Sequence, residues 1–198
     1  MNFDLAEKIN ELIQSNELDK AIQISEDELK KLTKTDFHKL IGWDLTALAD
    51  PFCDRINLFF NSAVKDIKKV GAIYCEMNGF TINYDMWYVD FFAYKKSQGH
   101  EDYDWLADWD YDNRDLSVAF SGIEEILTIF KDYMENEKWS DELQEKSFEI
   151  SEIIVVLRLQ QLFRQATEIA KTKNYPWTKI PFLVTAHDYD LIYKVTGL

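Results

Sequence analysis

Apolar and polar residues alternate on both sides of the dipeptide Asn78-Gly79, and this pattern restricts the fold more than any other in the chain. An Asn-Gly pair between two short apolar runs favours a two-residue hairpin turn, because both residue types tolerate positive φ angles. A second turn at Asp85-Met86 returns the chain once more. The sequence therefore predicts a three-stranded antiparallel meander between residues 72 and 111.

The two turns also predict which residues share a face of this meander, since side chains alternate between the faces of a strand. The predicted pairs are Met77 with Phe80, Cys75 with Ile82 and Ile73 with Tyr84, followed by Tyr84 with Trp87, Ile82 with Val89 and Phe80 with Phe91. These side chains form one apolar face, on which Cys75 is a buried free thiol. The opposite face carries aromatic, acidic and polar side chains: Tyr74, Glu76, Thr81, Asn83, Tyr88, Asp90, Phe92 and Tyr94.

The N-terminal residues show the three-to-four-residue spacing of apolar side chains that is typical of helices. Residues 3–14 and 17–33 predict a helical hairpin, with Asn16 as the N-cap of its second helix. Asp50-Pro51 then begins a further helix, because proline is well tolerated in the first helical turn.

A long helix is predicted from Ser140 to about Lys171. Its middle is apolar on all sides, which is typical of a helix in the centre of a domain. The β-branched run 153–156 leaves a strand as an alternative at that point. Residues 182–198 are expected to form a short tail that docks through apolar side chains.

These elements predict a predominantly helical α+β fold with a helical hairpin, a small antiparallel meander of three or four strands and a long buried C-terminal helix. Leu116, Val118 and Phe120 alternate and supply the fourth strand. We expect one domain over residues 1–198, in which residues 1–34 are a helical extension and residues 50–198 the main body.

The net charge of −14 excludes several classes of function. An acidic surface repels nucleic acid and anionic lipid and favours a basic partner. No apolar run approaches the roughly 20 residues that cross a bilayer, and the first residues lack the pattern of a secretion signal. We therefore expect a cytoplasmic protein that binds neither nucleic acid nor membrane and needs no cofactor. The sequence does not indicate its oligomeric state.

Much of the acidity gathers in residues 98–120, which we call the acidic segment: it holds seven acidic residues against one arginine, Arg114. Tryptophan and tyrosine are interleaved with these charges, and both residue types are enriched at interface hot spots. The predicted partner-binding residues are Tyr88, Asp90, Phe92, Tyr94, Asp104, Trp105, Asp108, Trp109, Asp110, Tyr111 and Asp112. The alternative is a solvated acidic loop that its tryptophans anchor to the sheet.

The first functional hypothesis is a non-enzymatic binding protein that masks a basic protein partner. Its concrete version is an immunity protein that neutralises a bacterial toxin, for example a nuclease with a positively charged site. A second hypothesis is a scaffold whose N-terminal helical hairpin holds a peptide in a groove lined by Leu5, Ile9, Ile22 and Leu29. A third is a hydrolase that uses His187 and the aspartates between 104 and 115 around a divalent metal ion.

Overall fold

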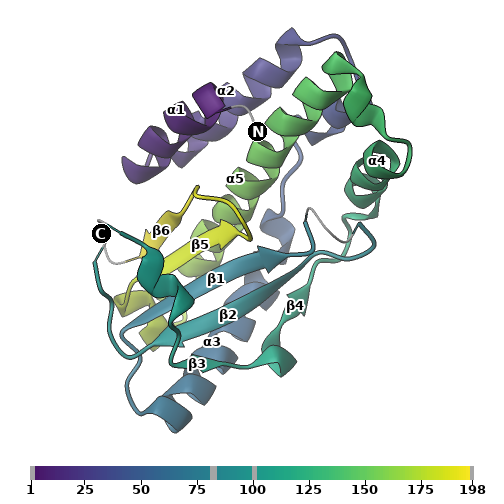
Figure 1. The fold of residues 1–198 in the computed structure, drawn as a ribbon. Coiled ribbons are helices and arrows are strands. Elements are labelled where there is room, and N and C mark those ends of the chain that lie inside the picture. Colours follow the sequence, from purple (N-terminus) through teal and green to yellow (C-terminus); the bar gives the residue numbers. More distant parts are fainter. Residues whose placement is uncertain (1–2, 81–83, 100–101, 197–198) are drawn as a thin grey trace.

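A mixed β-sheet of six strands packs against helices α3 and α5, and the N-terminal helices α1 and α2 lie along α5 (Figure 1). This computed structural model describes residues 3–80, 84–99 and 102–196. The predicted α+β class, with helices predominating, is confirmed.

The elements have the following bounds. The α-helices are α1 (Phe3–Gln14), α2 (Leu18–Lys31), α3 (Ala49–Ile67), α4 (Glu124–Glu135) and α5 (Glu142–Thr172). The strands are β1 (Ala72–Asn78), β2 (Tyr88–Tyr94), β3 (Tyr111–Asp112), β4 (Val118–Ala119), β5 (Phe182–Ala186) and β6 (Tyr193–Thr196). Short 3-10 helices are η1 (Asp36–Leu40), η2 (Thr46–Leu48), η3 (Asp104–Ala107), η4 (Arg114–Leu116), η5 (Lys138–Ser140) and η6 (Pro176–Lys179).

Strand β1 lies in the middle of the sheet, and its pairing corrects the predicted meander. The strand order is β3-β2-β1-β5-β6, and β4 pairs with β2 beside β3. Strand β1 pairs antiparallel with β2, so that Cys75 lies opposite Phe91 instead of Ile82. On its other edge β1 pairs parallel with β5, where Cys75 lies opposite Val184. Both edges of β1 are therefore occupied, and Tyr84 does not pair with Ile73.

The predicted two-residue turn at Asn78-Gly79 is wrong because a longer connection joins β1 to β2. Gly79 does have the positive φ that was expected, at 82°, but Asn78 remains in the strand. The rings of Phe80 and Trp87 are buried 4.9 Å apart, and each lies within 5.5 Å of the ring of Phe130 on α4. These aromatic contacts draw both ends of the connection into the core. The middle of the predicted second strand, residues 81–83, lies outside the described residues.

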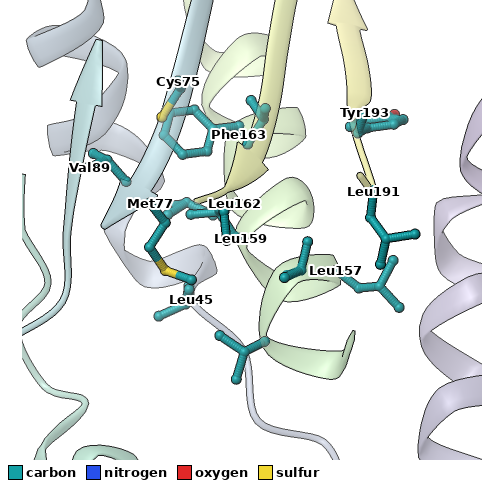
Figure 2. Close-up of a cluster of buried hydrophobic side chains, with 14 of the residues drawn as sticks. Leu45, Cys75, Met77, Val89, Leu157, Leu159, Leu162, Phe163, Leu191 and Tyr193 are labelled. Atoms are coloured by element: carbon teal, nitrogen blue, oxygen red, sulfur yellow. The ribbon is translucent and has the colours of Figure 1, made fainter. Parts of the chain in front are cut away.

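The prediction of two chemically different sheet faces is confirmed. Ile73, Cys75, Met77, Val89 and Phe91 are buried in the main core. Figure 2 shows Cys75 and Met77 on the same side as Leu159, Leu162 and Phe163 of α5, where the helix covers the sheet. The opposite face, which we call the outer sheet face, carries Tyr74, Phe92 and Tyr94 in a separate cluster with Trp105 and Leu106.

The C-terminal residues form a β-hairpin and not a docking tail. Strands β5 and β6 pair antiparallel, and β5 brings its apolar residues beside β1. Sequence pattern did not indicate this pairing, since about a hundred residues separate the two parallel strands and no local turn signals their contact.

The N-terminal helical hairpin is confirmed, but Asn16 ends the first helix and does not cap the second. Its φ is 60°, and the amide of Glu17 donates to the carbonyl of Leu12 at 2.8 Å. A hydrogen bond from an amide to the carbonyl five residues earlier, next to a residue in the left-handed conformation, is typical of a Schellman motif at a helix C-terminus. The Asn16 side chain instead accepts a hydrogen bond from the hydroxyl of Tyr193 on β6.

Most residues of helix α5 between Ser147 and Ala170 are buried, and the β-branched run 153–156 is helical. The helix contacts the sheet through one side and α2 and α3 through others. A buried ion pair joins it to α2: Arg158 Nη2 lies 2.5 Å from Glu26 Oε1, and both side chains are about nine-tenths buried. The amide of Gly42 also donates to Glu26 Oε1, at 2.9 Å.

Breaking this ion pair should be far more damaging than breaking an exposed pair between the same helices. Arg158→Met leaves the Glu26 carboxylate buried without its cation, and we expect a loss of about 3–5 kcal/mol in the free energy of unfolding. Arg164→Met removes the exposed pair of Arg164 with Asp19 and should cost about 1 kcal/mol or less. Urea denaturation of both variants tests this difference, and equal losses would contradict it.

A second prediction concerns the buried carboxyl of Glu152 on α5. Burial raises the pKa of Glu152 to about 6, although a hydrogen bond from Tyr189 opposes the shift. Because the folded pKa lies above the unfolded one, the neutral carboxyl stabilises the fold below about pH 4.5, and this stability is lost as the pH rises through about 6.

Glu152→Gln keeps the side chain neutral at every pH. At pH 8 the variant should exceed the original protein by about 2 kcal/mol in unfolding free energy, and at pH 4.5 the two should converge. Denaturation curves at both pH values check this. Glu145→Gln, exposed on the same helix, serves as the control and should show no such pH-dependent gain.

Candidate functional site

A pocket of about 390 Å³ opens on the outer sheet face, and it is the candidate functional site. Its floor is built by strands β1 and β2, which contribute Tyr74, Glu76, Asn78, Asp90 and Phe92. Its rim is built by Leu106, Ala107 and Trp109 in and after η3, by Arg114 in η4 and by His187 after β5.

The floor is ordered by the register of β1 and β2. Tyr74 lies opposite Phe92, and Glu76 lies opposite Asp90. Side chains directly opposite one another in an antiparallel pair have Cβ atoms about 5 Å apart. An aromatic pair and a carboxylate pair therefore lie side by side on the floor of the pocket. The rings of Tyr74 and Phe92 are stacked, with centroids 5.8 Å apart.

Glu76 accepts two hydrogen-bonded contacts that hold its carboxylate in place. The hydroxyl of Tyr74 donates to Oε2 at 2.9 Å, and His187 Nδ1 lies 2.8 Å from Oε1. Burial, followed by the charge of Glu76, raises the pKa of Tyr74 well above its ordinary value, so the phenol remains a proton donor. The Glu76 side chain is only 19% exposed, which lowers the freedom of its carboxylate.

Asp90 is the more deeply buried carboxylate, with a side chain that is 6% exposed. Asn78 Nδ2 donates to Oδ2 at 2.9 Å, and the hydroxyl of Ser117 donates to Oδ1. Arg114 Nη1 reaches Oδ2 only at 3.5 Å, and the Arg114 side chain is 68% exposed. Neutral donors hold the charge of Asp90, and the arginine stays at the edge of the pocket.

Two tryptophans beside the pocket have opposite surroundings. Trp105 is buried, and its ring lies 4.7 Å from the ring of Tyr94 in an edge-to-face contact. Trp109 is 44% exposed, lines the pocket and packs on Phe92 with ring centroids 4.8 Å apart. Figure 1 shows the teal segment that contains these residues crossing the sheet on the side opposite α3 and α5.

The structure brings some of the predicted binding residues together and separates others. Asp90, Phe92 and Trp109 line the pocket, whereas Tyr94 and Trp105 are buried beneath the acidic segment, where the Tyr94 hydroxyl donates to the carbonyl of Leu106 at 2.7 Å. Tyr88 is half-buried at the end of β2, opposite Asn78.

The predicted residues of the acidic segment are spread around the pocket. The side chains of Asp104, Asp108, Asp110 and Asp112 are exposed. The backbone amide of Lys95 donates a hydrogen bond to the carboxylate of Asp110, and the Lys95 ammonium group lies 3.1 Å from the same carboxylate. Both contacts lower the pKa of Asp110, and they give this aspartate a structural role. Tyr111 turns toward α3, where its hydroxyl lies 2.6 Å from that of Ser62.

Seven pocket residues were not among the predicted binding residues: Tyr74, Glu76, Asn78, Leu106, Ala107, Arg114 and His187. Glu76 was placed on the correct face by the alternation of β1, and that alternation was the available signal. His187 reaches the pocket because β5 pairs parallel with β1 and the amide of His187 donates to the carbonyl of Met77 at 2.9 Å. No local sequence signal announces that pairing.

Three further observations bear on function. Among the residues that the structure describes, no group of three or more His, Cys, Asp or Glu side chains is arranged to hold a metal ion. Within the same residues, no helix has the length and apolar character needed to span a bilayer. Cys53 and Cys75 are both buried free thiols, and burial raises the pKa of each.

The chain gave no match in comparisons with protein-family models, with curated proteins or with solved structures.

The different surroundings of the two tryptophans predict that Trp105 stabilises the fold and that Trp109 is available at the surface. Trp105→Ala opens a cavity between η3 and the sheet and should lower the unfolding free energy by about 3 kcal/mol or more. Trp109→Ala removes a half-exposed ring and should cost about 1 kcal/mol. Chemical denaturation measures both values. If Trp109→Ala destabilises the fold as much as Trp105→Ala does, Trp109 is an anchor of the acidic segment and is not free to bind a partner.

Proposed function

We propose that this chain is a non-enzymatic binding protein that masks a basic protein partner with its outer sheet face. The observation that carries the proposal is the pocket, in which the carboxylates of Glu76 and Asp90 lie beside the exposed ring of Trp109. Aromatic anchors and desolvated charges are the groups that dominate binding energy at protein interfaces. The concrete version is an immunity protein that blocks the positively charged site of a bacterial toxin.

Charge around the pocket supports a basic partner. The exposed carboxylates of Asp108, Asp112 and Asp115 belong to the same acidic segment as Trp109 and Arg114, which line the rim. A surface with one sign of charge accelerates the encounter with a partner of opposite charge. Asp110 contributes less to this steering because Lys95 already neutralises it.

The scaffold hypothesis is less well supported by the contacts of the N-terminal hairpin. Leu5, Ile9, Ile22 and Leu29 are all buried in the main core. Helix α2 packs on α5, and α1 contacts β6. These side chains hold the hairpin to the rest of the chain and do not line an open groove for a peptide.

The hydrolase hypothesis requires His187 to act with the aspartates of the acidic segment. His187 is instead engaged by Glu76, and its Nε2 lies 3.6 Å from the carboxylate of Asp188. The side chains nearest to it thus come from β1 and from its own loop. No contact of the described residues favours a metal-dependent reaction over binding.

Charge reversal near the pocket should slow association with the partner. We expect the triple variant Asp108→Lys, Asp112→Lys and Asp115→Lys to bind more slowly and to lose most of the salt dependence of its association rate. A pull-down from an extract of the native host, analysed by mass spectrometry, identifies the partner. Surface plasmon resonance at two ionic strengths then measures the rates.

The control changes the net charge equally at a distance from the pocket. Glu7→Lys and Glu11→Lys lie on α1, where both side chains are exposed, and Glu28→Lys lies on α2, where the side chain is 36% exposed. This control should retain the partner and most of its association rate. If both triple variants behave alike, only net charge matters and the outer sheet face is not the interface. A retained partner that is acidic would also contradict the proposal.

A further inference from the structure

We propose that the pocket on the outer sheet face holds the side chain of one arginine of the partner, with its guanidinium group between Glu76, Asp90 and Trp109. This inference rests on the proposed masking function and specifies which group of the basic partner enters the pocket. It follows from the chemistry of the floor, the aromatic wall and the balance of charge at the rim.

The floor offers acceptors to a planar donor group. Glu76 and Asp90 lie opposite each other on β1 and β2, and their carboxylates face the same pocket. Each ionised carboxylate has about four acceptor sites, and each here receives two or three contacts, so acceptor capacity remains on both. A guanidinium group carries five N–H donors in a fixed fork, which can bridge two such carboxylates.

The wall supplies the second element that a guanidinium group requires. Trp109 and Phe92 contact each other at one side of the pocket, and Trp109 remains 44% exposed. A cation over an aromatic face is attracted by the ring quadrupole, and indole is the strongest such partner. The methylene groups of an arginine side chain also bury favourably against aromatic rings.

The charged side chains that line the pocket favour the binding of an added cation. Glu76 and Asp90 contribute two carboxylates to the floor; Arg114 is the cationic side chain beside Asp90, and the imidazole of His187 lies beside Glu76. Arg114 also lies 3.8 Å from Asp112, so its charge is divided between two carboxylates at long distances. A partner arginine can therefore take closer contacts with the floor than Arg114 makes.

Arginine fits this arrangement better than lysine does. The lysine ammonium group is a compact, strongly hydrated charge, whereas guanidinium is planar, weakly hydrated and able to stack on an aromatic ring. A pocket of about 390 Å³ that combines separated carboxylates with aromatic walls matches the larger planar group. The site is accordingly expected to discriminate between the two basic side chains.

The test uses the whole protein and three small probes: N-acetyl-arginine amide, the neutral isostere N-acetyl-citrulline amide and N-acetyl-lysine amide. Binding is followed by NMR through the indole N–H signal of Trp109, with the Trp109→Ala protein used to assign that signal. We expect the arginine probe to bind about tenfold more tightly than the citrulline probe, because its hydrogen bonds to the carboxylates are charge-assisted. The lysine probe should bind more weakly than the arginine probe.

Substitutions test whether the arginine probe binds in the pocket. Glu76→Gln keeps the size of the side chain and removes one charge of the floor, so it should weaken arginine binding about tenfold. Glu7→Gln on α1 removes the same charge at an exposed position and should leave the affinity unchanged. Thermal melts must show that both variants remain folded. If Asp90→Lys still melts cooperatively and still binds the arginine probe, that result independently contradicts the proposed site.

The inference is overturned if no saturable change of the Trp109 signal occurs up to the solubility limit of the arginine probe. Equal affinity for arginine and citrulline, or unchanged affinity in Glu76→Gln, also overturns it. Failure of the masking function is distinguishable from these results. If the charge-reversed triple variant binds the partner more slowly but Glu76→Gln binds it with unchanged affinity, the masking function stands without an arginine in the pocket. If no basic partner is found but the arginine probe binds, the pocket stands without the masking function.

Discussion

The burial of helix α5 is the constraint on which the rest of the structure depends. A helix that is apolar on nearly all sides must be covered on all sides, and the chain provides the sheet, α2 and α3 for this purpose. Figure 2 shows leucines and phenylalanine of α5 beneath β1, where the side chains of Cys75 and Met77 meet them. The N-terminal hairpin is thus part of the cover of α5.

This arrangement carries one charged contact through the core. Arg158 points from α5 to Glu26 of α2, and the carboxylate also receives the amide of Gly42. Such a pair contributes little net stability when it is intact, since its desolvation offsets most of its attraction. It does impose a cost on any packing that separates the two groups, and it therefore specifies how α2 lies on α5.

The same alternation that covers α5 creates the candidate site. Each residue of β1 that faces α5 is followed by one that faces outward, so Cys75 and Met77 in the core imply Glu76 on the outer sheet face. The outer face is only partly covered, because η3 packs Trp105 and Leu106 over Tyr74 and Tyr94 and leaves the two carboxylates beside an open space. Aromatic residues in the acidic segment thus have two roles: Trp105 holds the segment to the sheet, and Trp109 remains available at the rim.

The sequence by itself determined the helices and the two faces of β1 and β2, because both depend on local periodicity: apolar spacing at Ile9 or Ile56, and alternation at Cys75 and Glu76. It also indicated that Asp90, Phe92 and Trp109 belong to one acidic and aromatic surface. Only the tertiary structure decided the partner strands of β1, the wide connection after Gly79 and the arrival of His187 beside Glu76. A strand edge has no preference of its own for a neighbour, and β5 becomes the neighbour of β1 only when α5 packs against the sheet and brings the distant residues of β5 beside it.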